Sequence, residues 1–161
     1  MHAPTVSPPW AYTLQLPHDP RSPGVARSVL RVVLRAHGMT GLADTAELMV
    51  SELTTNAYQH SWGSYSLRMC GAGQGRIRLS VWDSNPEIPP PFRDSGEHGS
   101  TRGARGPDAY VPAQQTSLTE RGRGLALVQM CADSWGGLAL PGAPSGQGGK
   151  LLWVVCGEKP E

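Results

Sequence analysis

The sequence is short of the features that mark several protein classes. It has only three cysteines, Cys70, Cys131 and Cys156, which stand far apart and form no CxxC pair. An odd number of separated thiols suits neither a disulfide framework nor a cysteine metal site, and indicates buried thiols in a reducing compartment. No stretch is long and apolar enough to span a bilayer, and no apolar leader follows Met1. We therefore expect a cytoplasmic protein without a membrane partner.

An excess of charge of one sign is also missing. The formal net charge is +1 at pH 7, and aromatic residues make up 6% of the chain. Neither a basic field nor an interleaving of aromatic and basic residues is present, which argues against a nucleic-acid binder. The 161 residues suit one domain with a core large enough to fold without staples.

Hydrophobic periodicity divides the chain into short elements. Residues 1–9 and 158–161 read as tails around a single domain at 10–157. Helices are predicted at about 25–36, 43–60 and 123–132, and strands at 10–16, 65–70, 76–83, 134–140 and 150–156. The pattern predicts an α+β two-layer sandwich, with helices packed on one face of a mixed, mainly antiparallel sheet.

The spacing of apolar residues supports the first two helices. In the first helix, the apolar residues that keep helical spacing are Val25, Val29, Val32, Val33 and Ala36. In the second helix, the residues expected on the buried face are Leu42, Ala46, Met49, Leu53 and Ala57. Residues 84–119, by contrast, are rich in Pro and Gly and show no period, which is typical of a functional lid or a disordered segment.

Three groups of polar residues could carry chemistry. Glu52, Asn56 and His60 are four residues apart and share one face of the second helix, where an amide oxygen suits Mg²⁺ and a carboxylate suits a general base. A solvated polar flank is the alternative for this group. Asp83 ends a strand, where it could accept a hydrogen bond from a purine amine or simply form an Asx-turn with the residues that follow.

The third group opens the last helix. Gly122 and Gly124 allow close approach of backbone to a ligand, and the positive helix end favours phosphate. Arg121 and Arg123 could add charge-assisted contacts. A helix start with flexible glycines is the alternative, because a lone GxG is common.

The order of these groups is more specific than any one of them. A helix with E-x-x-x-N, a strand ending in Asp, a long irregular segment, G-x-G-L and a final strand with G-K-x-x-W follow one another over about residues 12–156. This series resembles the GHKL (histidine kinase-like) ATPase superfamily, and within it the small bacterial anti-sigma-factor serine/threonine kinases. The resemblance implies a Bergerat-type ATP-binding fold with ATP and Mg²⁺ as cofactors.

Roles for individual residues follow from the resemblance. It implies that Asn56 binds Mg²⁺, that Glu52 is the catalytic general base and that Asp83 holds the adenine amine, with Asn85 in the same pocket. The phosphate end would be lined by Gly122, Arg123, Gly124 and Leu125, under an ATP lid formed by residues 86–121. His60 matches no catalytic position and is expected at the rim or in a structural role.

Two residues depart from the family pattern. Asn85 stands where relatives carry glycine, which is tolerable if its φ is negative or left-handed. Lys150 stands where many relatives have Thr, so a hydroxyl contact to the nucleotide is lost.

Two functions remain open. One is an anti-sigma or partner-switching regulator that phosphorylates Ser or Thr of an antagonist protein with Mg-ATP, which is favoured by the presence of both Glu52 and Asn56. The other is a nucleotide-dependent module that holds a sigma factor or another regulator without transfer. The implied partners are a sigma factor, an anti-anti-sigma protein, or a second copy of the chain. A basic stripe of Arg27, Arg31 and Arg35 could dock an acidic partner or be a solvated face.

Overall fold

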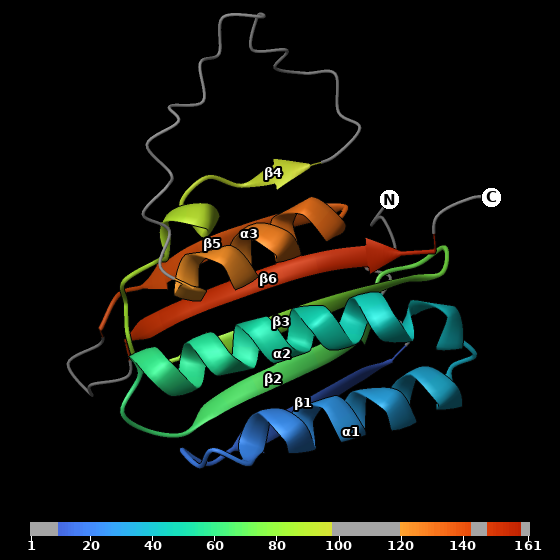
Figure 1. The fold of residues 1–161 in the computed structure, drawn as a ribbon, viewed down its shortest axis with the longest axis horizontal. Helices are drawn as coiled ribbons and strands as arrows, with labels where there is room; N and C mark the ends of the chain where they lie inside the picture. Colours follow the sequence, from blue (N-terminus) through green and yellow to red (C-terminus); the bar gives the residue numbers. More distant parts are fainter. Residues whose placement is uncertain (1–9, 98–119, 143–147, 159–161) are drawn as a thin grey trace, which may run out of the picture.

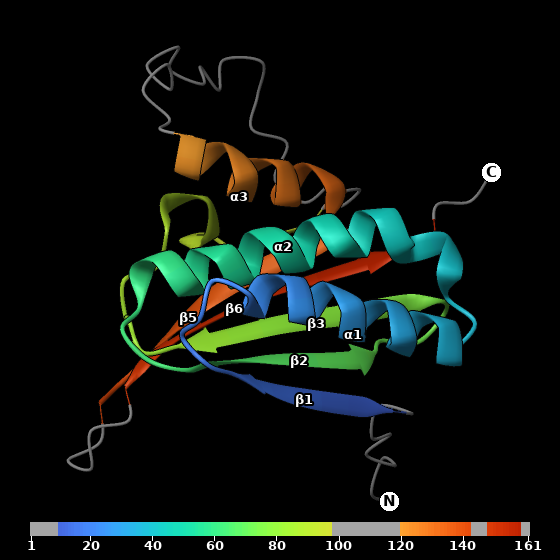
Figure 2. The ribbon, with the colours of Figure 1, turned by 60° about the horizontal axis from the view of Figure 1, so that its bottom comes forward.

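The protein is a layer of helices on one face of a single sheet, as a computed structural model shows (Figures 1 and 2). The structure describes residues 10–97, 120–142 and 148–158. The six-stranded sheet has the order β1-β2-β3-β6-β5-β4, and every neighbouring pair is antiparallel. The predicted α+β sandwich is confirmed, and its described strands form an antiparallel rather than a mixed sheet.

The strands run close to the ranges that the sequence predicts. They are β1 (Ala11–Leu16), β2 (Tyr65–Gly71), β3 (Arg76–Asp83), β4 (Gly96–Glu97), β5 (Ser134–Leu140) and β6 (Gly149–Gly157). The two-residue strand β4 was not predicted, because so short a pairing leaves no periodic pattern. It extends the sheet by pairing with β5 at its edge.

The helices are α1 (Ser22–Ala36), α2 (Ala43–His60) and α3 (Glu120–Cys131), with short 3₁₀ turns at Thr40–Leu42 and Pro90–Phe92. The bounds of α2 agree with the prediction. Helices α1 and α3 each begin three residues earlier than predicted. For α1 the reason is Pro23 in the first turn, since a proline lacks an N–H that a helix start does not need.

The core lies between the helices and the sheet. All five residues predicted for the inner face of α2 are buried, and so are Ile77, Leu79 and Val81 of β3. Of the α1 residues singled out by their spacing, Val33 is buried and Val29 is partly buried, whereas Val25 is 50% exposed and Val32 is 61% exposed. The buried stripe of α1 consists of Ala26, Leu30, Val33 and Leu34.

The cysteines are free, as expected. Cys70 and Cys156 are buried, and burial raises the pKa of the Cys156 thiol to about 12. No described helix is long and apolar enough to cross a membrane.

Candidate functional site

Helix α2 positions the first part of the candidate site. Glu52 and Asn56 are half-buried and lie one turn apart on this helix. The carboxylate of Glu52 lies against the backbone of Gly124 in α3, so closely that a Cβ on Gly124 would overlap it. Two of the three sequence groups therefore meet where α2 and α3 pack together.

The amide oxygen of Asn56 is the clearest sign of a ligand site. Asn56 Oδ1 is buried and has no hydrogen-bond partner among the described residues. Buried polar atoms in native proteins are nearly always paired, so an unpaired one calls for an explanation. An amide oxygen is a ligand that Mg²⁺ accepts, and this orphan atom fits the metal that the sequence motif implies.

A cation bound here would need further ligands from outside the described residues. The described part of the chain contains no group of three or more His, Cys, Asp or Glu that could hold a metal ion. Mg²⁺ typically takes one or two protein ligands and completes its shell with water and substrate phosphates. The site therefore fits a metal that arrives with a nucleotide.

The first turn of α3 supplies the predicted phosphate end. Gly122, Arg123 and Gly124 all lie near its start, and the first four amides of any helix lack an intrahelical acceptor. The side chains of residues 121–123 lie outside the described part of the structure. Leu125 is 3% exposed and packs in the core, so only its backbone could contribute to a ligand site.

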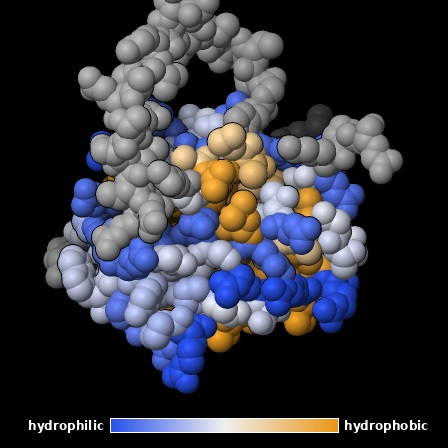
Figure 3. Space-filling model, in the orientation of Figure 1, coloured by the Kyte–Doolittle hydropathy of each residue, from blue (hydrophilic) through white to orange (hydrophobic). Residues whose placement is uncertain are grey.

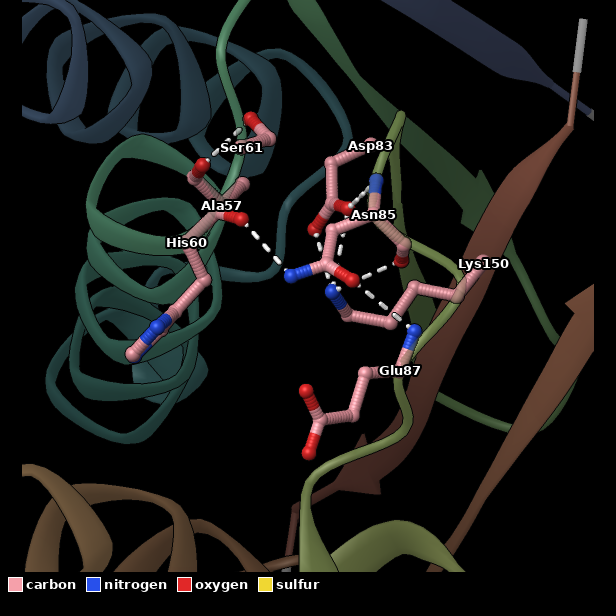
Figure 4. Close-up of polar contacts among 7 residues, drawn as sticks. All are labelled: Ala57, His60, Ser61, Asp83, Asn85, Glu87 and Lys150. Carbon is pink, nitrogen blue, oxygen red and sulfur yellow. Dashed lines mark hydrogen bonds and ion pairs between the residues drawn. The ribbon is translucent and has the colours of Figure 1, made fainter.

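Asp83 forms the other end of the site, at the last residue of β3. Its register partner on β6 is Lys150, so both side chains leave the sheet on the helix-covered face. Lys150 Nζ lies 3.0 Å from Asp83 Oδ1 and 2.9 Å from Oδ2 (Figure 4). The two side chains are only 1% and 2% exposed, so this is a buried ion pair.

Asn85 connects this ion pair to α2. Its backbone N–H donates to Asp83 Oδ1 at 2.8 Å, which is the Asx-turn that the sequence offered as an alternative. Its side chain donates to the backbone oxygen of His60 at 2.8 Å and accepts from the N–H of Glu87 at 3.0 Å (Figure 4). His60 therefore contributes its carbonyl group to this network.

The backbone of Asn85 needs no glycine. Among the described residues, Gln74 is the one non-glycine residue with a positive φ, so Asn85 lies in an ordinary region. The departure from the family pattern at this position is therefore accommodated without backbone strain.

Gly149 is a site residue whose role the sequence did not reveal. Its φ is +146°, and a Cβ there would overlap the carbonyl oxygen of Asp83. Only glycine lets β6 approach β3 this closely at the point where Lys150 turns toward Asp83. The alternation of Ile77, Leu79 and Val81 could have placed Asp83 on the inner face, but the pairing with Lys150 depends on the register of a remote strand.

The first part of the predicted lid packs against the domain body. Phe92 is fully buried, and the side chain of Gln129 in α3 donates to the carbonyl of Pro91. Gly96 and Glu97 pair with β5. Residues 98–119 of the predicted lid lie outside the described residues.

Comparison with known proteins agrees with this arrangement. The family model of the histidine kinase-like ATPase domain matches residues 16–139, which include Glu52, Asn56, Asp83 and Gly124 but end before Lys150. No curated protein matches the sequence. Because the family model covers most of the chain and both ends of the candidate site, the chain belongs to the histidine kinase-like ATPase family, whose domains bind ATP.

Proposed function

We propose that this ATP-binding domain uses Mg-ATP to phosphorylate a Ser or Thr of an antagonist protein, as an anti-sigma or partner-switching regulator. The observation that carries the proposal is the buried, unpaired Oδ1 of Asn56, one helical turn from a carboxylate that lies against the start of α3. A metal ligand, a base and a helix N-terminus are the parts that phosphoryl transfer needs.

Each part has a defined task. Asn56 would hold Mg²⁺, which would supply positive charge at the phosphates. The free amides at the start of α3 contact the phosphate oxygens. Glu52 accepts the proton of the attacking Ser or Thr hydroxyl. The hydroxyl oxygen forms a bond to the γ-phosphorus, the bond between the γ-phosphorus and the β-phosphate oxygen breaks, and ADP leaves.

The outer surface offers places for a protein partner. Val25 and Val32 are seven residues apart and project from the same side of α1, and both are at least half exposed. On α3, Leu127 and Met130 are 47% and 71% exposed, and Figure 3 shows hydrophobic side chains on this side of the molecule. We propose these surfaces as contacts for a sigma factor, an anti-anti-sigma protein or a second copy of the chain.

The arginine stripe of α1 contributes less to docking than the sequence suggests. Arg27 donates to the hydroxyl of Ser51 at 3.3 Å, and Arg31 pairs with Glu47. Both contacts tie α1 to α2, and the Arg31 guanidinium holds the pKa of the Glu47 carboxyl below its usual range. Arg35 is exposed in the last turn and remains a candidate for contact with an acidic partner.

The second candidate function is a nucleotide-dependent module that sequesters a sigma factor or regulator without transfer. The buried Asp83–Lys150 pair favours it, because the carboxylate expected to hold adenine already has its partner within the protein. A binding module has to change its conformation when nucleotide binds, but it does not have to catalyse phosphoryl transfer.

One experiment separates the two functions. The wild type and Glu52→Gln are incubated with Mg²⁺ and γ-³²P-ATP and with each anti-anti-sigma protein encoded in the same genome. We expect label on one of these proteins with the wild type and none with the variant. If no protein is labelled but a sigma factor co-elutes with the wild type only when ATP is present, the protein is the binding module and the kinase proposal is wrong.

A further inference from the structure

We propose that the ammonium group of Lys150 occupies the position on Asp83 that the amine of adenine would otherwise take. The site therefore binds nucleoside triphosphates through their phosphates and does not select adenine. The inference rests on the proposed nucleotide binding at this site. It concerns which part of the nucleotide this chain recognises.

The contacts of the Lys150 ammonium group lie within the protein. An ammonium group has three N–H donors and no acceptor. Lys150 Nζ contacts three oxygens, namely both carboxylate oxygens of Asp83 and the backbone oxygen of Asn85 at 3.1 Å. These contacts direct the ammonium group toward the protein, so Lys150 acts on the adenine base through what it does to Asp83.

Asp83 is left with little capacity to recognise a base. A carboxylate can accept about four hydrogen bonds. Oδ1 already accepts from the N–H of Asn85 and from Lys150, and Oδ2 lies 2.9 Å from the ammonium nitrogen in the ion pair. The remaining acceptor positions lie on a side chain that is 2% exposed and whose charge is neutralised by its partner. A base amine would have to displace the ammonium group to gain a charged acceptor.

The position of Lys150 is built into the sheet. Lys150 and Asp83 are register partners on adjacent strands, and the close approach of the strands at this point requires Gly149. Asn85 links the pair to the end of α2 through the carbonyl of His60 (Figure 4). A lysine held by strand register, a turn and a helix end cannot swing aside as a surface lysine would, because each alternative position leaves a buried charge unpaired.

At the end of the site formed by α2 and α3, by contrast, a buried polar atom lacks a partner among the described residues. Asn56 Oδ1 is buried without a partner, and Glu52 faces the start of α3. A ligand therefore gains hydrogen bonds and metal ligation at its phosphates, whereas its base meets groups that are already paired. This difference predicts a site that discriminates by phosphate number and metal rather than by base.

The test compares ligands that differ at the base or lack the nucleoside. Wild-type protein is titrated by calorimetry with Mg-ATP, with Mg-ITP, in which a carbonyl oxygen replaces the 6-amine, and with magnesium tripolyphosphate. A base amine held by a free carboxylate would favour ATP over ITP by roughly ten- to a hundredfold. We expect dissociation constants for ATP and ITP that agree within about threefold, in keeping with the loss of that one contact. A preference for ATP of about tenfold or more overturns the inference.

The variant Lys150→Thr should gain the preference for ATP over ITP that the wild type lacks. Removal of the ammonium group frees the Asp83 carboxylate, so the variant should prefer ATP over ITP by about tenfold or more. An unchanged ratio in a folded variant overturns the inference. If the variant does not fold, the ratio of the wild type still decides, because it needs no substitution.

The failure of the proposed function looks different. If neither nucleotide nor tripolyphosphate binds to the wild type, the nucleotide site itself is wrong and the inference falls with it. If nucleotides bind with a clear preference for ATP, the nucleotide site stands and the role given to Lys150 is wrong.

Discussion

The two ends of the candidate site differ in how well their polar groups are satisfied. At the end formed by Asp83 and Lys150, every charged group has a partner within the fold, and both side chains are almost fully buried. At the end formed by α2 and α3, Asn56 Oδ1 is buried without a partner. Unpaired buried polar atoms are costly, so the one at Asn56 calls for a partner that a ligand could supply.

The comparison teaches that a motif residue can keep its position and change its task. Asp83 ends its strand where the family pattern places a base-binding carboxylate, yet here it holds a lysine of the neighbouring strand. Glu52 and Asn56 lie one turn apart on α2, and Asn56 Oδ1 has no partner among the described residues. Under the proposed function, chemistry at the metal and phosphates is retained while recognition of the adenine base is given up.

The largest effect is expected from Glu52→Gln. If Glu52 is the general base, the substitution should lower the rate of phosphoryl transfer by about 10²- to 10⁴-fold, because proton acceptance is lost. Nucleotide affinity should change little, since the amide keeps the shape of the side chain. Single-turnover transfer and calorimetry on the same preparation measure the two quantities, and equal losses in both would contradict the assignment.

Lys150→Met should produce the largest loss of stability. It leaves the Asp83 carboxylate buried without its partner, which costs about 3–5 kcal/mol in the free energy of unfolding. The matched double variant, Lys150→Met with Asp83→Asn, removes both charges and should recover much of that loss. Urea denaturation of the three proteins checks this, and a double variant as unstable as the single one would show that the ion pair is not the reason.

Gly149→Ala should have a smaller effect at the same end. The residue has a φ of +146°, and its Cβ would overlap the carbonyl of Asp83. Strain of this kind costs about 1–3 kcal/mol. Gly148→Ala is the adjacent control, because its Cβ would meet backbone at no less than 3.0 Å. If urea denaturation shows comparable losses in the free energy of unfolding for both substitutions, Gly149 has no special role.

The smallest change in stability is expected from Gly124→Ala, at the opposite end. Alanine favours a helix over glycine by up to about 1 kcal/mol, and the atom it meets is the movable end of the Glu52 side chain. Stability should therefore hold or rise slightly, while displacement of the Glu52 carboxylate slows transfer by about tenfold or more.

Gly24→Ala in α1 is a suitable control for Gly124→Ala. Its Cβ would make only an ordinary contact with Arg27, at 3.5 Å, so transfer should be unaffected. If Gly124→Ala left transfer unchanged as well, the closeness of Glu52 and Gly124 would have no functional meaning.

The sequence predicts the phosphate end better than the base end, for a physical reason. Glu52 and Asn56 lie on a long helix with one clear apolar stripe, so spacing along the chain places them. The contact between Asp83 and Lys150 depends on the register of β3 against β6, which are far apart in sequence. Periodicity within either strand indicates the face of a residue but not its partner.

Helix α1 shows a different limit. It carries two apolar stripes at helical spacing, one through Val25, Val29 and Val32 and one through Ala26, Leu30 and Val33. Periodicity supports both, and only packing against α2 and the sheet decides that the second is buried. Val25 and Val32 of the first stripe are left exposed.

The dependence of ATP binding on Mg²⁺ in Asn56→Ala tests the central claim most directly. ATP is titrated with and without Mg²⁺ into the wild type, into Asn56→Ala, and into Gln59→Ala as an exposed control on the same helix. Loss of a residue that merely supports a metal ligand costs about 10- to 100-fold in metal affinity, and loss of the ligand itself should cost at least as much. The account predicts that Mg²⁺ strengthens ATP binding in the wild type and in Gln59→Ala but not in Asn56→Ala. Equal strengthening in all three would contradict it.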